Sequence, residues 1–271
     1  MSSDILGETD ILVNAQRRDE LKNFVASMTP INRSKQLGRW NGQVCPVVAG
    51  LPQRQAMKMI ARIGEVASSV NLKLAGKSCS KPLIILIDNE ASATAADLSK
   101  RFPITLRHDG VAMLGNFVRS SEPVRWLSLT NNNGFNASGS TGQDLQEGVN
   151  STAARRGGWP SRLEAPLRPE ISAMIVIVDG KQLADVSLEA LSDYVSFVAF
   201  ANPRQGADWP SRSVMSLFDN DRDITITNAL SADDASYLKA LYATSVESQG
   251  QNQRNSIVSN MMRSDRIDRQ P

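Results

Sequence analysis

Apolar and polar positions alternate most regularly in residues 53–70, where apolar side chains recur every three to four residues. The charged side chains of this segment fall on or beside the opposite face: Arg54, Lys58, Arg62 and Glu65. This spacing predicts an amphipathic helix. The same reasoning predicts a helix at 188–201, behind the N-cap candidate Ser187, and a further helix at 231–243.

Two near-continuous apolar runs, residues 83–87 and 171–178, predict strands that are covered on both faces of a sheet. A shorter strand-like pattern lies at residues 124–130. Helices and strands are therefore mixed along the chain. We expect a single α+β domain across residues 31–243.

The remaining segments are polar and give weaker signals. Residues 1–30 predict a mobile N-terminal segment that contains an edge strand at 11–13 and a short helix at 19–27. Residues 131–151 are rich in Asn, Gly and Ser and predict a flexible loop. Residues 244–271 predict a polar, disordered tail.

Composition excludes two classes of partner. The 271 residues carry 30 Lys and Arg against 28 Asp and Glu, with the signs interspersed, so no basic surface for nucleic acid is indicated. No apolar stretch is long enough to cross a membrane. Asp4, Glu8 and Asp10 stand where a signal peptide needs a basic and then an apolar segment, so the chain as written carries no leader.

Cys45 and Cys79 are the two cysteines, and neither lies in a CxxC motif. A disulfide between them would close a loop of about 35 residues and contribute about 3–4 kcal/mol. It would favour an oxidising compartment, so we expect a periplasmic or secreted protein whose leader is not present in this chain. Two unrelated buried thiols in a cytoplasmic protein are the alternative.

The segment 171–242 combines an apolar strand, a helix, a proline-containing loop, the turn Ser213-Val214-Met215 and a last helix. That last helix follows an L-x-x-D-D…L-Y pattern with these residues: Leu230, Asp233, Asp234, Leu241 and Tyr242. The order resembles the C-terminal part of matrixin-type metzincin zinc peptidases. In that family a strand precedes an active-site helix of pattern HExxHxxGxxH, a methionine turn underlies the metal, and a closing helix follows. The resemblance implies a zincin-like mixed sheet with packed helices.

The zinc ligands of that family are missing. Aligned on its pattern, the three histidine positions fall on Ser192, Ser196 and Asn202, and the general-base position falls on Asp193. A shift of one residue places Asp193, Phe197 and Pro203 at the ligand positions and Tyr194 at the base. The one histidine, His108, lies outside the segment. Catalytic zinc needs three good donors and an open position, so we expect no metal, no cofactor and no catalytic residue.

The resemblance still implies a groove on the face where a peptidase would hold substrate. We expect these residues to line it: Ser192, Asp193, Tyr194, Ser196, Asn202 and Met215. A groove without its metal can bind a peptide or protein partner by adding an extended chain to a sheet edge.

Three other candidate sites are weaker. His108-Asp109 is typical of a surface turn, and no GxSxG elbow supplies a nucleophile for it. Gly134, Gly139 and Gly142 lack the strand, helix and lysine of a phosphate-binding loop. Carboxylates in residues 219–223 suit calcium in number, but no EF-hand glutamate follows them.

The whole chain also resembles an uncharacterised family of exported alphaproteobacterial proteins. The shared features are R-W…C-P-V-V-x-G-L at Arg39–Leu51, the pair Asp193-Tyr194 and the L-K-A-L-Y end of the last helix. This resemblance implies export and no particular activity.

Three hypotheses follow for function. The favoured one is a non-catalytic metallopeptidase-like domain that acts in binding or as an envelope structural component. The alternative is a hydrolase with a carboxylate-based centre around Asp193, Asp208 and residues 219–223. A cytoplasmic structural protein of unrelated fold is the third.

Overall fold

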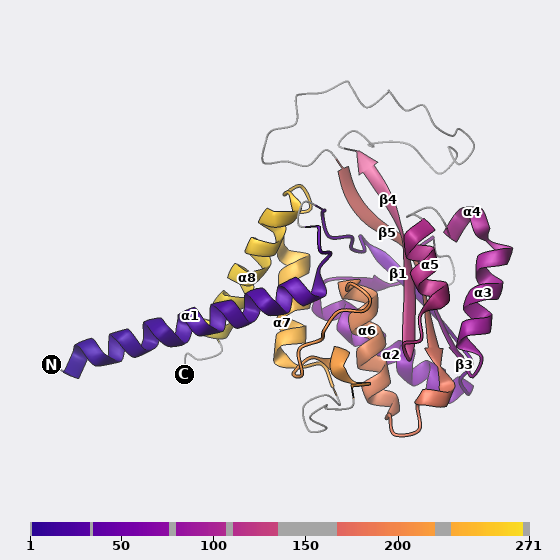
Figure 1. Ribbon diagram of the computed structural model, residues 1–271, viewed down its shortest axis with the longest axis horizontal. Helices are drawn as coiled ribbons and strands as arrows, with labels where there is room; N and C mark the ends of the chain where they lie inside the picture. Colours follow the sequence, from indigo (N-terminus) through magenta and orange to yellow (C-terminus); the bar gives the residue numbers. More distant parts are fainter. Residues whose placement is uncertain are drawn as a thin grey trace.

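The computed structural model describes residues 2–32, 35–75, 80–106, 111–134, 167–219 and 229–267 (Figure 1). It has a mixed α and β architecture around one five-stranded sheet of order β2-β1-β3-β5-β4. The strands are β1 (Gln43–Ala49), β2 (Lys73–Leu74), β3 (Pro82–Asp88), β4 (Val124–Gly134) and β5 (Leu167–Asp179). All adjacent pairs are parallel except β4 with β5, which places an antiparallel strand at one edge.

The two apolar runs form the centre of the sheet, as their sequence predicted. β3 and β5 pair in register from Leu83 opposite Met174 to Asp88 opposite Asp179. Residues 174–178 are buried throughout, because helices cover both faces of the sheet.

One face of the sheet carries the larger core. It is covered by α2 (Gln53–Ser69) and α6 (Leu188–Ala201), and α1 (Ser2–Met28), α7 (Ala232–Ala243) and α8 (Gly250–Ile267) complete the same cluster. The opposite face carries a smaller core under α3 (Ala91–Arg101) and α5 (Val111–Arg119), with the short α4 (Pro103–Leu106) between them. The predicted helices at 53–70, 188–201 and 231–243 are confirmed.

The predicted disordered tail is wrong, because residues 250–267 form helix α8. Its apolar face enters the main core through Ile257, Val258, Met261 and Met262. These apolar residues are few and are surrounded by polar ones, so the sequence of the segment is typical of a disordered tail. The helix is stabilised when its apolar side chains pack against another surface. That surface is supplied by α1 and α7, which α8 contacts.

The predicted edge strand at 11–13 is also wrong, since α1 is helical from Ser2 to Met28, and the short helix predicted at 19–27 is part of it. The C-terminal turns of α1 bury Leu21, Phe24, Val25 and Met28 in the main core. Arg17 donates to Asp233 of α7 and Asp265 of α8, so one cation joins three helices.

The predicted loop at 131–151 begins later than expected. Residues 131–134 extend β4 and pair with Leu167–Glu170 of β5. The remainder of that loop lies outside the described residues.

Truncation of a core side chain on α8 provides a test of its docking. Ile257→Ala removes a completely buried side chain and is expected to lower the free energy of unfolding by about 2–4 kcal/mol. Ser259→Ala, at an exposed position of the same helix, is expected to change it by less than about 0.5 kcal/mol. Chemical denaturation measures both, and equal effects would contradict the packing of α8.

Candidate functional site

Helix α6 is buried along most of its length. Ser187 caps its first turn by accepting a hydrogen bond from the Ala190 N–H at 3.1 Å. Every residue from Ala190 to Ala201 is buried, so α6 has no solvent-facing side along this stretch. The helix ends at Asn202, whose left-handed backbone (φ 45°, ψ 56°) terminates it.

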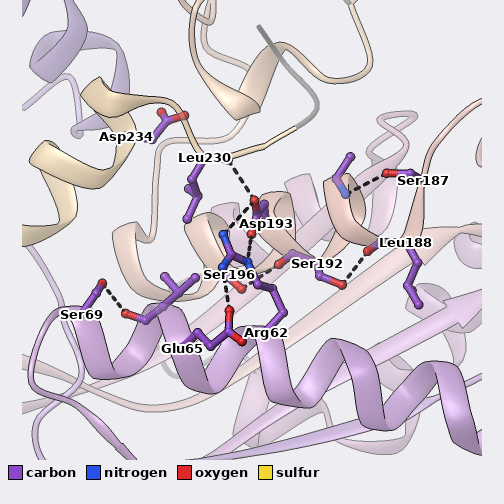
Figure 2. A network of polar contacts seen from close by, with 12 residues as sticks. Arg62, Glu65, Ser69, Ser187, Leu188, Ser192, Asp193, Ser196, Leu230 and Asp234 are labelled. Atoms are coloured by element: carbon purple, nitrogen blue, oxygen red, sulfur yellow. Dashed lines mark hydrogen bonds and ion pairs between the residues drawn. The ribbon is translucent and has the colours of Figure 1, made fainter. Parts of the chain in front are cut away.

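Ser192 and Ser196, at the two predicted ligand positions within α6, face the interior and are 2% and 0% exposed. Each hydroxyl donates to a carbonyl of its own helix, Ser192 to Leu188 and Ser196 to Ser192, both at 2.6 Å (Figure 2). Such bonds occupy the hydroxyl protons within the helix. Neither side chain lines an open groove.

Asp193, at the predicted general-base position, is buried and forms an ion pair with the partly exposed Arg62 of α2. The Arg62 Nε and Nη2 donate to the two carboxylate oxygens at 2.5 and 3.2 Å, and the Leu230 N–H donates to Oδ2 at 3.0 Å (Figure 2). The carboxylate side chain is 4% exposed, against 40% for Arg62. Asp193 therefore joins α6 to α2 and to the segment that precedes α7.

The hydrogen bonds of Arg62 favour its charged form. The hydrogen bonds of Arg62 to Asp193 and then to Glu65 hold the pKa of the guanidinium above its usual range. Glu65 accepts from Arg62 Nη1 at 2.7 Å on the exposed side of α2. The arginine thus links one buried and one exposed carboxylate.

Tyr194 and Asn202 have roles in the fold: Tyr194 packs against another ring, and Asn202 ends α6. The Tyr194 ring packs edge-on against Phe218 with centroids 5.2 Å apart. Burial raises the pKa of the Tyr194 hydroxyl well above its usual range, so the phenol remains protonated at neutral pH. Asn202 is half-buried at the end of α6, three residues beyond Ala199 and six beyond Ser196.

Met215 lies in a buried one-turn 3-10 helix, η2 (Val214–Ser216), that contacts α6. Ser213 caps this turn, and its hydroxyl accepts from the Met215 N–H at 3.2 Å. The turn is joined to α7 by Asp234, whose carboxylate accepts from Ser213 Oγ at 2.6 Å and from the Val214 N–H at 2.8 Å. α6, the methionine-containing turn and the closing helix are therefore packed together.

Asp234 also organises the start of α7. It accepts from the Ser231 N–H at 3.0 Å, while its own N–H donates to the Ser231 hydroxyl at 3.0 Å, which completes a capping box. This carboxylate is completely buried. The second aspartate of the L-x-x-D-D pattern, Asp234, therefore caps the helix that follows it. The first aspartate, Asp233, forms an ion pair with Arg17.

The motifs Arg39-Trp40 and Leu241-Tyr242 form hydrogen bonds at the ends of α6 and α7. Trp40 Nε1 donates to the Ala199 carbonyl at 2.8 Å and the Tyr242 hydroxyl donates to the Phe200 carbonyl at 3.2 Å, both at the end of α6. Arg39 Nη1 donates to the carbonyls of Leu241 and Thr244 at the end of α7. These motifs are visible in the sequence, but no pattern in the sequence indicates which groups they contact.

Two hydrogen bonds join Trp126 of the edge strand β4 to the segment that follows α6. Trp126 of β4 donates through Nε1 to the Pro203 carbonyl at 3.2 Å, and Gln205 Nε2 donates to the Trp126 carbonyl. Residues 124–128 of β4 are buried. An extended partner that pairs with β4 at Trp126 would have to displace Gln205 from this carbonyl.

The other predicted sites are not assembled in the described structure. Asp208 and Asp219 are exposed, whereas Asp193 is buried. His108, Asp109 and residues 220–223 lie outside the described residues. Within the described ranges, no three His, Cys, Asp or Glu side chains gather in a way that could hold a metal ion.

The predicted disulfide joins Cys45 to Cys79, and Cys79 lies outside the described residues. Cys45 is buried on β1, and the described part of the chain contains no free cysteine. The disulfide between Cys45 and Cys79 stays a prediction.

No described helix combines the length and the apolar character needed to span a membrane. Comparison of the chain with family models, with curated proteins and with solved structures finds no match.

Proposed function

We propose that this protein is non-catalytic and is built on a metzincin-like scaffold, in which the positions of the zinc ligands and general base have become structural. The order of β5, α6, η2 and α7 is the order that the resemblance implies, and η2 contacts α6. Asp234 adds a specific link between η2 and α7. These contacts support the scaffold, and the bonding of α6 supports the loss of its chemistry.

The observation that carries the proposal is the state of three polar side chains on α6. Ser192 and Ser196 bond to helix carbonyls, and Asp193 is neutralised by Arg62. A general base must reach the proton that it removes, and a metal ligand must present a free lone pair to an open site. Side chains buried to this degree and bonded to the chain meet neither condition.

The alternative, a hydrolase centred on Asp193 and Asp208, would need these carboxylates to converge on a substrate. Asp193 is buried against Arg62, whereas Asp208 is exposed. The non-catalytic proposal therefore accounts better for both residues.

Most positions expected to line a groove are buried, so we propose that the protein acts through its outer surface, as a binding or structural component of the cell envelope. The proposed compartment rests on the Cys45–Cys79 disulfide. Mass measurement of native protein without reductant tests it, because two free thiols would remove its support.

Metal analysis tests the non-catalytic proposal. The purified chain, incubated with excess zinc and then dialysed, is expected to retain far less than one metal ion per molecule by plasma mass spectrometry. Serine hydroxyls and a carboxylate paired with arginine are poor zinc ligands. One tightly held transition-metal ion per chain would contradict the proposal.

A further inference from the structure

Two aspartates stand side by side where the two central strands of the sheet end. Asp88 is the last residue of β3 and Asp179 is the last residue of β5, and the two are paired in the parallel register. Both side chains are half-buried. They lie at the carboxyl end of the parallel strands, which is where open α/β sheets commonly bind their ligands.

A buried arginine with unpaired donors lies beside these aspartates. Arg125 of β4 is 2% exposed, and its Nη2 donates to the Ser92 hydroxyl in the first turn of α3 at 3.1 Å. Its Nε and Nη1 have no hydrogen-bond partner within the described part of the chain. Burial lowers the pKa of the guanidinium, and the charge of Asp179 opposes this shift. Buried donors without a partner are rare and indicate a group that the chain itself does not supply.

The two aspartates are held by their own loops rather than by Arg125. Asp88 accepts from the Glu90 N–H at 3.0 Å, and Asp179 accepts from the Lys181 N–H at 3.0 Å. Each carboxylate is thereby fixed at the end of its strand. The unpaired nitrogens of Arg125 therefore remain available to another acceptor.

One ammonium group already lies against this carboxyl end of the sheet. Lys181 Nζ donates to Glu90 at 2.6 Å, and this bond, with the charges of Asp179 and Asp88, raises the pKa of the lysine. Both side chains of the ion pair are exposed, at 59% and 71%. An exposed pair of this kind is weak, so a competing ammonium group can take the place of Lys181.

We infer that Asp88, Asp179, Arg125 and Lys181, here called the strand-end cluster, bind a small zwitterion with the chemistry of a free α-amino acid. The ligand carboxylate accepts charge-assisted hydrogen bonds from the unpaired donors of Arg125. It can approach the guanidinium beside Ser92, which is exposed. The ligand ammonium replaces Lys181 near the two aspartates. A simple anion fits less well, because its charge would lie beside two carboxylates.

This inference is independent of the metzincin-like scaffold, because no residue of the strand-end cluster belongs to α6. Titration of the full chain, followed by nuclear magnetic resonance, tests it with three probes. Glycine carries both charged groups, whereas acetate and methylammonium carry one each. Glycine is expected to bind about tenfold more tightly than either single-group probe, because its two groups are linked. No binding of glycine, or tighter binding of inorganic phosphate than of glycine, would overturn the inference.

Two variants locate the binding. Arg125→Gln is expected to weaken glycine binding about tenfold or more, since it removes the charged donor. Lys181→Met changes an exposed side chain and removes the competing ammonium, so it is expected to strengthen glycine binding several-fold. The control Lys100→Met removes an exposed charge from α3 and is expected to leave the affinity unchanged. If Lys181→Met weakened glycine binding, or behaved like Lys100→Met, the inference would fail whether or not Arg125→Gln folds.

Discussion

Asp234→Ala is expected to lower the free energy of unfolding by about 3–5 kcal/mol. The carboxylate is completely buried and accepts from Ser213 Oγ and from the N–H groups of Val214 and Ser231. Its removal leaves these donors without a partner and destroys the capping box of α7. Urea denaturation followed by circular dichroism measures the loss.

Two variants calibrate this prediction. Asp234→Asn keeps an acceptor for the backbone N–H groups, so it is expected to cost about half as much as the alanine variant. Lys239→Ala, at an exposed position of α7, is expected to change the free energy of unfolding by less than about 0.5 kcal/mol. If Asp234→Ala were as harmless as Lys239→Ala, the link between α7 and the methionine-containing turn would be absent in solution.

Arg62→Met is expected to lower the free energy of unfolding by about 2–3 kcal/mol. The substitution keeps the aliphatic stem but leaves the Asp193 carboxylate, 4% exposed, with the Leu230 N–H as its remaining described donor. Loss of one partner of a fully buried ion pair costs about 3–5 kcal/mol, and the 40% exposure of Arg62 reduces that figure here.

Arg54→Met is the matched control for this substitution. Arg54 lies on the same helix and is exposed, so its replacement is expected to leave the free energy of unfolding of the monomer nearly unchanged. Equal effects at the two arginines would show that the pair of Arg62 with Asp193 adds nothing specific.

The elements with strong apolar periodicity could be predicted because the spacing of their own apolar residues indicates which side chains are buried. The helix at 188–201 was placed at its observed bounds, and the apolar runs 83–87 and 171–178 lie within β3 and β5. Local apolar spacing was enough for these elements, since each is covered by whatever packs on it.

The helices at the two ends could not be predicted in the same way. α8 contributes four apolar side chains among many polar ones, and α1 has its buried residues only near its C-terminal end. Each helix is stabilised by the other and by α7, so its signal lies in distant residues.

The side-chain contacts of α6 were the hardest part of the structure to predict from the sequence. The resemblance placed Asp193 at a groove floor, yet Arg62 pairs with it across 131 positions of the sequence. Arg62 was assigned to the charged face of an amphipathic helix, and no local pattern distinguishes a solvated arginine from one that reaches a buried carboxylate. The hydrogen bond of Gln205 to the Trp126 carbonyl of β4 also joins residues that are distant in the sequence.

The free energy of coupling between Arg62 and Asp193 tests most directly whether α6 now serves the fold. It is obtained from the unfolding free energies of the unmodified chain, Arg62→Met, Asp193→Asn and the double variant. Because removal of the charge at Asp193 relieves the cost of the missing arginine, a coupling of about 1.5–3 kcal/mol is predicted. Strictly additive effects, with Asp193→Asn as stable as the unmodified chain, would contradict a structural role and leave the carboxylate free for chemistry.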